Sequence, residues 1–281
     1  MCRWLAYSGS PVLLEELLYQ PRFSLIDQSL HSQLGVETTN GDGFGVGWYG
    51  VDGVGNTAAP VLFRDVGPAW SDLNLRELAH TISSPLFLAH IRASTGTPVQ
   101  QTNCHPFRYG RWLWQHNGAI RGFPLVKRDL MLAIDPELFT SISGSTDSEV
   151  MFHLALTFGL QTEPVAAVER MAGFVESAGR RHGVEHPLQM TVAVTDGEAL
   201  WAFRYSSEGK SRSLFFSTAV ATLRQMYPEV EHLNRLSDES RIVVSEPLGE
   251  LVGAWQPVPE SSYGYVCKGA DRLGDFRPVA P

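Results

Sequence analysis

Cys2 directly follows the initiator methionine, so removal of Met1 would place a thiol and a free α-amine on one residue. A thiolate is the nucleophile in cysteine chemistry, but a free thiol with a pKa of about 8.5 is mostly protonated at neutral pH. An α-amino group titrates at about 7.7–8.0 and could take the thiol proton, as N-terminal amines do for threonine nucleophiles. The alternative is that Cys2 is a small apolar residue of a first strand.

Three further stretches carry groups that could bind or stabilise a charged substrate. Arg92 ends a predicted strand, where its guanidinium could hold a carboxylate through two hydrogen bonds, although a surface salt bridge is the common alternative. Asn117 and Gly118 indicate a hairpin turn, yet an Asn amide and a Gly N–H can also form an oxyanion hole. Asp147 falls in the first turn of a predicted helix, where it either complements the helix dipole or binds a substrate ammonium.

Two other stretches match known motifs by letter but lack the structural context that those motifs need. HGVEH (182–186) fits a zinc signature, but Gly183 and Pro187 argue against the required helix. GVGWYG (45–50) fits a dinucleotide-binding pattern, but its glycines lie in an apparent strand and not in a turn that begins a helix. We therefore expect no metal and no cofactor. The histidines that could be imagined as a metal cluster are predicted to be core or turn residues: His90, His105 and His116.

The first half of the chain supplies the elements that would position these groups. A strand is expected over residues 2–7, and Ser10-Pro11 is expected to begin a helix with Ser as N-cap. The glycine-dense stretch 41–50 indicates a strand that other backbone approaches closely. Strands are also expected over 87–94 and 111–118, each running into a turn.

Helices and then more strands follow. Thr146 and Glu149 fit a capping box for a helix over 145–160, and Glu163-Pro164 begins another through about residue 177. Asp196-Gly197 indicates a hairpin. Further strands are expected over 188–195, 198–206, 213–219, 241–246 and 262–267. Strands, helices and strands in this order predict an α+β fold in which two mostly antiparallel sheets are stacked between helix layers.

Composition excludes several classes of protein. The chain has 281 residues, 43% hydrophobic and 19% charged, which is ordinary for a globular domain. A net charge of −8 argues against nucleic-acid binding, because that affinity comes from Lys and Arg. No apolar run is long enough to span a membrane, and no signal peptide is apparent. Three cysteines without a CxxC pair indicate a reducing, cytoplasmic compartment.

The order of the reactive stretches along the chain resembles a known family. Cys2, HIRAST (90–95), HNG (116–118) and STDSE (145–149) together resemble the class II glutamine amidotransferases, which belong to the N-terminal nucleophile hydrolases. Two more stretches strengthen the resemblance: NGDGFGVGWY (40–49) and NCHPF (103–107). The segment 243–266 resembles the end of short stand-alone members, such as the ergothioneine-pathway amidohydrolase and the glutathione-degrading amidotransferase subunit.

The resemblance implies a four-layer αββα sandwich and a role for each residue. Cys2 would attack the γ-carbonyl of a γ-glutamyl group, with its own α-amine as base and then as acid. Asn117 and the Gly118 N–H would hold the oxyanion. Arg92 would bind the α-carboxylate and Asp147 the α-ammonium. The same pocket would be lined by Thr95 and His116.

Departures from the family pattern direct the functional hypothesis. Many members read HTRWATHG where this chain reads HIRASTGT, so Ala93 and Gly96 replace a Trp and a His, and the pocket is expected to be wider beyond the γ-amide. Most such glutaminase domains are fused to a synthase, whereas here we expect one domain over residues 1–281, with Met1 removed. The leading hypothesis is hydrolysis of glutamine or a γ-glutamyl amide or peptide through a thioester on Cys2.

The alternatives are a glutaminase subunit that delivers ammonia to a separate synthase, and a catalytically silent scaffold. The expected partner is a small-molecule γ-glutamyl substrate or glutamine, with no nucleic acid and no membrane. A homo-oligomer or a partner subunit stays open.

Overall fold

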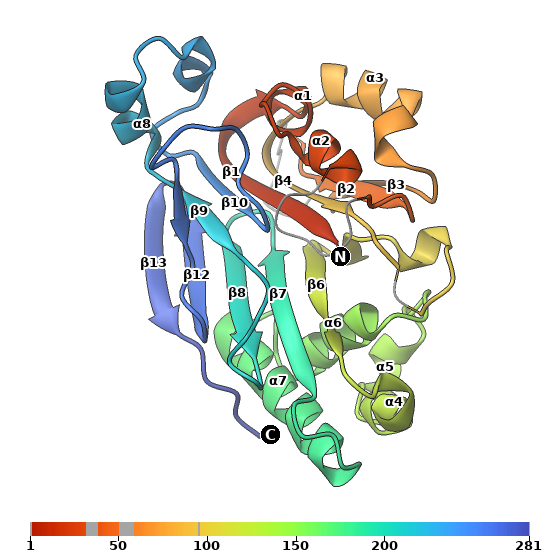
Figure 1. Ribbon diagram of the computed structural model, residues 1–281. Coiled ribbons are helices and arrows are strands. Elements are labelled where there is room, and N and C mark those ends of the chain that lie inside the picture. The colour runs from red at the N-terminus through yellow and green to blue at the C-terminus, as the bar shows by residue number, and fades with distance from the viewer. Residues whose placement is uncertain (1, 32–38, 51–58, 95, 281) are drawn as a thin grey trace.

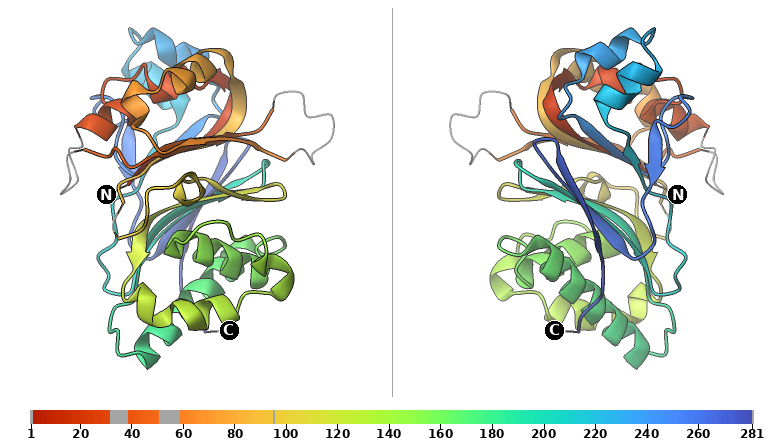
Figure 2. Two further views of the ribbon diagram at one scale, coloured as in Figure 1. Left: turned by 90° about the vertical axis from the view of Figure 1, so that its right-hand side faces the viewer. Right: turned by 90° about the vertical axis from the view of Figure 1, so that its left-hand side faces the viewer.

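Two antiparallel β-sheets lie face to face, and helices cover the outer face of each sheet (Figures 1 and 2). The computed structural model describes residues 2–31, 39–50, 59–94 and 96–280. Every strand pairing between these residues is antiparallel. The structure therefore confirms the predicted α+β fold with four layers.

The seven-stranded sheet contains the strand that begins just after Cys2 and the strand that ends just before Arg92. Its order is β11 (Trp255–Pro257), β9 (Phe215–Ser217), β10 (Arg241–Val244), β1 (Arg3–Leu13), β4 (Ser83–Ile91), β2 (Phe44–Trp48) and β3 (Val61–Asp65). Because β1 and β4 are neighbours and Arg3 pairs with Ile91, the residues just before β1 and just after β4 lie side by side.

The six-stranded sheet packs face to face against the seven-stranded sheet. Its order is β13 (Ala270–Asp275), β12 (Ser262–Cys267), β8 (Leu200–Ser206), β7 (Leu188–Thr195), β6 (Trp112–Ile120) and β5 (Phe107–Tyr109). The predicted hairpin at Asp196-Gly197 is confirmed, because it joins β7 to β8 and Thr195 pairs with Leu200.

Each sheet carries its own helices. The seven-stranded sheet is covered by α1 (Glu15–Leu18), α2 (Leu25–Leu30), α3 (Leu73–Thr81) and α8 (Val220–Met226). The six-stranded sheet is covered by α4 (Phe123–Leu132), α5 (Pro136–Phe139), α6 (Asp147–Thr157) and α7 (Pro164–Arg181). Short 3-10 turns lie at Ala69–Ser71, Gln101–Asn103 and Glu231–Arg235. Buried apolar side chains fill the two helix–sheet interfaces and the space between the sheets, which is the main driving force for this layering.

The helix predicted at Ser10-Pro11 is wrong. Both residues belong to β1, which runs to Leu13, and α1 begins only at Glu15. The ladder with β4 shifts register between Ser8 and Val12, so Pro11 lies where the pairing is irregular. Proline has no N–H to give to a ladder, and an irregularity of this kind tolerates it.

Other local predictions are confirmed with small changes. The stretch 41–50 contains β2, which covers only Phe44–Trp48, and a Cβ on Gly45 would lie 2.3 Å from the His105 carbonyl oxygen, so other backbone does approach it closely. Thr146 caps α6 by accepting from the Glu149 N–H. The reciprocal half of the expected capping box is absent, because the Glu149 carboxylate instead accepts from the Ser143 and Gly144 N–H groups. Helix α7 runs to Arg181, four residues beyond the expected end.

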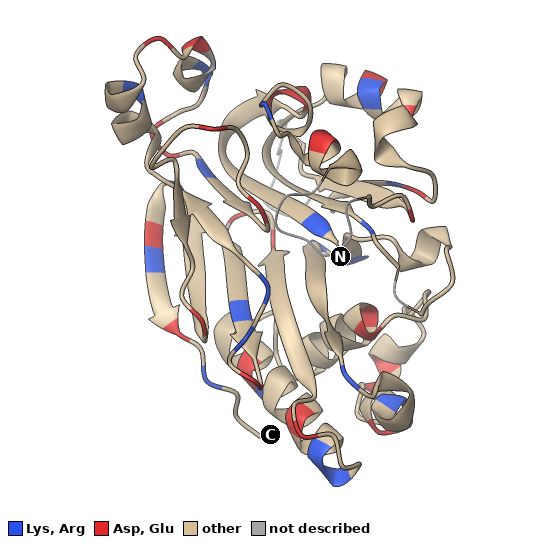
Figure 3. Cartoon of the chain, in the orientation of Figure 1, with Lys and Arg blue, Asp and Glu red and all other residues tan. Residues whose placement is uncertain are grey.

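Acidic and basic side chains are mixed over the described elements of both layers (Figure 3). No described helix is both long enough and apolar enough to span a bilayer. HGVEH lies beyond the end of α7, and within the described residues no group of three or more His, Cys, Asp or Glu side chains could hold a metal ion.

Candidate functional site

A cavity of about 290 Å³ lies where the ends of the two sheets meet the starts of α4 and α6. Described residues from five separate parts of the sequence line it: Cys2; Arg92, Ala93, Ser94, Gly96 and Thr97; His105; His116, Gly118, Ala119, Ile120, Gly122, Phe123 and Pro124; and Thr146 to Ser148. The cavity brings together five of the seven site residues that the sequence predicts. Thr95 lies outside the described residues, and Asn117 is considered below.

Cys2 is partly buried and precedes the first residue of β1. Its Sγ lies 3.6 Å from the Ala93 carbonyl oxygen, which follows Arg92 at the end of the neighbouring strand. Burial raises the pKa of the Cys2 thiol, and the Ala93 hydrogen bond and the nearby Arg92 charge oppose that increase only in part. The thiol is therefore protonated at neutral pH and needs a base before it can act as a nucleophile.

Arg92 is buried at the end of β4, and its guanidinium is held entirely by neutral oxygen atoms in the described chain. It donates to the Asp42 carbonyl at 3.2 Å, to the Thr97 hydroxyl at 2.7 Å and to the Ser94 hydroxyl at 3.1 Å. A buried guanidinium without a carboxylate partner retains a full charge to offer a ligand. The surface salt bridge that sequence left as an alternative is therefore wrong for Arg92.

Asn117 and Gly118 do not form a turn. They lie within β6, where Asn117 pairs with Thr191 and Gly118 with Met190, and the strand continues to Ile120. Glycine is required at position 118, because φ is +153° and a Cβ would lie 2.0 Å from the Gln189 carbonyl oxygen. Gly118 lines the cavity, whereas Asn117 is buried next to it and does not.

Asp147 occupies the first position of α6, with its carboxylate fixed by three donors. One oxygen accepts from the Ile120 N–H at 2.7 Å, and the other accepts from the Ser148 N–H at 2.8 Å and more weakly from the Ser148 hydroxyl. The first turn of a helix stabilises negative charge, and these N–H donors do the same. The oxygen that accepts from Ile120 makes one such bond and can still accept another from a cation in the cavity.

Three buried histidines surround this arrangement. Burial lowers the pKa of His90 to about 3, and burial also lowers the pKa values of His105 and His116. The His90 and His105 rings are in contact in a tilted arrangement with centroids 4.2 Å apart, and His116 Nδ1 lies 2.7 Å from the Ser148 hydroxyl. These rings are neutral at pH 7. The prediction that they are core residues is confirmed, and two of them also line the cavity.

Sequence reasoning missed two residues of the site. Ser148 joins His116 to Asp147, and the Asp42 carboxylate accepts from the Ser94 N–H at 2.7 Å and so fixes the loop after Arg92. Ser148 stands within the STDSE stretch that was singled out, so its place in the first helical turn was an available signal. Asp42 stands likewise within the stretch NGDGFGVGWY (40–49), but nothing in that stretch indicated that its carboxylate would fix the loop after Arg92.

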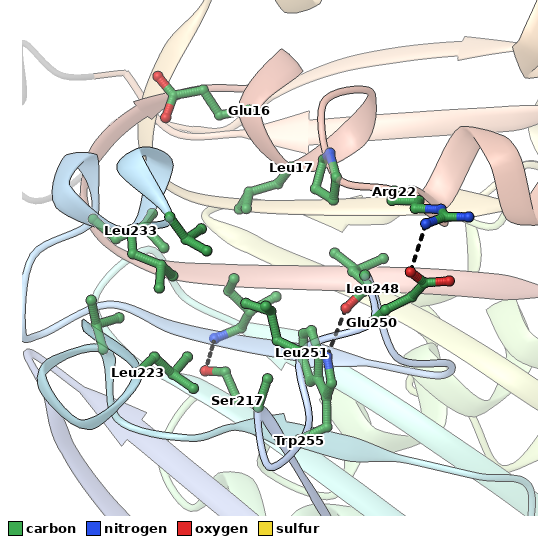
Figure 4. Close-up of a pocket in the computed structure, with 17 residues that line it drawn as sticks. Glu16, Leu17, Arg22, Ser217, Leu223, Leu233, Leu248, Glu250, Leu251 and Trp255 are labelled. Carbon is green, nitrogen blue, oxygen red and sulfur yellow. Dashed lines mark hydrogen bonds and ion pairs between the residues drawn. The ribbon is translucent and has the colours of Figure 1, made fainter. Parts of the chain in front are cut away.

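A second cavity, of about 280 Å³, lies in the helix layer over the seven-stranded sheet and has a different character (Figure 4). Its walls are mainly aliphatic, from residues such as Leu17, Leu223 and Leu248. Its polar groups are occupied: Arg22 pairs with Glu250 at 2.7 Å, and the Ser217 hydroxyl accepts from the Ile242 N–H. The reactive groups are therefore gathered in the first cavity.

A thiol, a buried cation and a fixed carboxylate around one cavity suit a zwitterion that carries an electrophilic carbonyl. The sequence matches the family model described as "Glutamine amidotransferases class-II" over residues 13–270. The "Probable glutamine amidotransferase DUG3" of Saccharomyces cerevisiae is 36% identical over 288 residues, covering 93% of this chain and 80% of that protein. The "Gamma-glutamyl-hercynylcysteine sulfoxide hydrolase" of Mycolicibacterium smegmatis is 32% identical over 122 residues, covering 43% of this chain and 52% of that protein.

Solved structures agree with this match. The structure of a "glutamine aminotransferase class-II domain protein" from Silicibacter pomeroyi superposes with a TM-score of 0.72 and 32% identity, covering 99% of this chain and 100% of that chain. Glutamine phosphoribosylpyrophosphate amidotransferase from B. subtilis superposes with a TM-score of 0.62 and 13% identity, covering 99% of this chain and 50% of that chain. At that identity the second match shows the shared fold alone.

Proposed function

Because the chain belongs to the class II glutamine amidotransferases, we propose that it cleaves a γ-glutamyl amide bond through a γ-glutamyl thioester on Cys2. The family and the N-terminal nucleophile hydrolase fold agree with the resemblance seen in the sequence. One observation carries the proposal: a single cavity has Cys2, Arg92 and Asp147 on its walls.

The glutamyl head group has one carboxylate and one ammonium on its α-carbon, and the cavity offers one partner for each. Arg92 would bind the α-carboxylate, because its charge has no carboxylate partner among the described residues. Asp147 would bind the α-ammonium, because its carboxylate is held in place by N–H donors. The neutral histidines support this assignment, since none of them competes with Arg92 for the carboxylate.

Removal of Met1 would supply the base. The α-amine of Cys2 would take the proton from the thiol, and Sγ would attack the γ-carbonyl carbon. The Gly118 N–H would stabilise the oxyanion, and the Asn117 amide would add a second bond by turning from its buried position into the cavity. The protonated amine would then give its proton to the leaving amine. Water would hydrolyse the thioester by the same steps, releasing glutamate and regenerating the thiol.

The cavity has room for an amine larger than ammonia. Gly96 lines it, and apart from the chain neighbours of Gly96 no described residue would have an atom within 4 Å of a Cβ at that position. Phe123 and Pro124 at the start of α4 add apolar surface to the same cavity. These features support a γ-glutamyl amide or peptide as substrate, and the matched hydrolase of M. smegmatis carries such a group in its name.

The test is intact-protein mass spectrometry before and after incubation with a diazoketone analogue of glutamine. We expect loss of one methionine and then a single adduct, which is absent in Cys2→Ala. Cys267→Ala is the matched control, because Cys267 is also a free and partly buried thiol. A protein with Cys2 exposed that stays unlabelled would refute the proposal.

A panel of γ-glutamyl amides then distinguishes substrates. Faster turnover of γ-glutamyl peptides than of glutamine supports hydrolysis of a larger amide. Glutamine as the best substrate, with turnover raised by a partner protein, would instead identify an ammonia-delivering subunit.

A further inference from the structure

A buried ion pair touches the residue that carries the proposed nucleophile. Arg3 Nε lies 2.6 Å from Glu246 Oε2, and Arg3 Nη1 donates to the Cys2 carbonyl at 3.0 Å. Arg3 is 3% exposed and Glu246 is 4% exposed, and neither lines the cavity. One guanidinium therefore joins the backbone of residue 2 to a buried carboxylate behind the site.

The strand register brings the two residues together. β1 pairs with β10 so that Leu5 faces Val244, and the same register extended by two residues places Arg3 opposite Glu246. Two hydrogen bonds just beyond the ladder keep the strands aligned, from the Ser245 N–H to the Trp4 carbonyl and from the Trp4 N–H to the Ser245 hydroxyl.

The carboxylate side of the pair is itself held by a helix. Gln28 on α2 is buried, and its amide donates to the carbonyl oxygens of Glu246, Pro247 and Phe23. The segment that carries Glu246 is therefore anchored to the helix layer as well as to the sheet.

A buried charge is unfavourable unless it is paired and hydrogen-bonded, so a buried pair is weak evidence for a role in stability alone. We propose that the Arg3–Glu246 pair positions the nucleophile by holding the backbone of Cys2 so that its thiol and amine face the γ-carbonyl. This inference rests on the proposed function, because it gives Cys2 the role of nucleophile. Arg3 is a positioning residue and touches no substrate. A guanidinium suits the task because its planar fork can hold two different oxygens in fixed directions.

The test compares variants that distinguish two roles of Arg3: positioning the Cys2 backbone, and neutralising the buried Glu246 carboxylate. Arg3→Lys keeps a cation but lacks the fork. The double variant Arg3→Met/Glu246→Leu replaces the pair with apolar side chains, an exchange that often preserves stability. Arg241→Met/Asp271→Asn is the control, because Arg241 on β10 pairs with Asp271 at 2.8 Å and neither residue lines the cavity.

For each protein the measurements are the unfolding midpoint, kcat and KM for the best γ-glutamyl amide, and the pH profile of Cys2 alkylation by iodoacetamide. We expect both Arg3 variants to lose kcat by about 10- to 100-fold while KM changes by less than about threefold, because a small misplacement of a reacting group has that effect. The alkylation profile of the double variant should move to higher pH, because a cation beside the thiol is lost. The Arg241 control should keep the wild-type kcat and profile.

A folded double variant with wild-type kcat and alkylation profile would overturn the inference and leave the pair a packing role. If the double variant does not fold, Arg3→Lys decides, and an unchanged kcat in that variant overturns the inference. Failure of the wild-type protein to cleave any γ-glutamyl amide would reject the proposed function. The alkylation profile of Arg3→Lys would then still decide the positioning role, because that variant keeps the cation beside the thiol: a shifted profile upholds the role and an identical profile refutes it.

Discussion

The buried histidine beside the site makes the folded protein sensitive to mild acid. His90 lies on β4 and is buried, with Nε2 3.1 Å from the His116 carbonyl oxygen and its ring tilted against the His105 ring. Burial lowers the pKa of His90 from 6.5 to about 3. The folded protein therefore leaves His90 neutral at pH values where the unfolded chain protonates it.

The sign and size of the effect follow from this difference. Stability from the neutral ring is fully present above pH 6.5 and is lost as the pH falls from 6.5 towards 3. At 1.36 kcal/mol for each pKa unit, a fall to pH 5.0 costs about 2 kcal/mol of unfolding free energy from His90. Burial lowers the pKa values of His105 and His116 as well, so they act in the same direction.

The assay is urea denaturation at pH 7.5 and pH 5.0, on wild type and on His90→Gln. The glutamine amide can still donate to the His116 carbonyl but does not titrate in this range. We expect the loss of unfolding free energy between the two pH values to be smaller in the variant by about 2 kcal/mol. His80→Gln is the control, because His80 is exposed and bonds to Glu15, which raises its pKa and gives the opposite sign. An acid sensitivity that is unchanged in His90→Gln would refute the reasoning.

Four further predictions concern the proposed reaction. Arg92→Lys should raise KM by about 10- to 100-fold with a smaller effect on kcat, because a point charge replaces a planar fork, and steady-state kinetics will show it. Asp147→Asn should raise KM by a similar factor of about 10 to 100 through loss of the ammonium partner, with an unchanged circular dichroism spectrum as the control. Gly118→Ala should lower kcat by about 100-fold, since its Cβ would lie 2.0 Å from the Gln189 carbonyl oxygen and would displace the oxyanion donor. Because burial raises the pKa of the Cys2 thiol, kcat/KM should rise with pH through the titration of the α-amine at about 7.7–8.0, and protein that retains the initiator methionine should be inactive.

Local sequence patterns predicted secondary structure correctly where a single residue type determines the local backbone conformation. Thr146 caps α6 as its sequence context indicates, and Asp196-Gly197 makes the hairpin. The same patterns were misleading where tertiary pairing decides. Ser10-Pro11 has the letters of a helix start, but the ladder between β1 and β4 continues through a register shift around it.

Asn117-Gly118 shows the same limit at the site itself. The dipeptide is common in tight turns, and only the pairing of β6 with β7 reveals that the strand runs on to Ile120. Its glycine is required by the Gln189 backbone, which is remote in sequence, so no local pattern could supply that reason. The role of Glu246 was equally hidden, because its partner Arg3 lies 243 positions away.

The two halves of the proposed site belong to different sheets, so the packing between the sheets is part of the catalytic geometry. The seven-stranded sheet brings Cys2 beside Arg92, whereas β6 of the other sheet carries Gly118. Directional bonds cross the interface near these residues. Trp4 Nε1 donates to the Thr191 hydroxyl at 3.2 Å, and that hydroxyl donates to the Asn117 carbonyl at 3.3 Å. Apolar packing alone would permit the sheets to slide, since it is non-directional, whereas these hydrogen bonds fix one relative position. The distance from the thiol to the proposed oxyanion donors is therefore set by the core between the sheets, and we expect a mutation there to reduce turnover without touching a residue of the cavity.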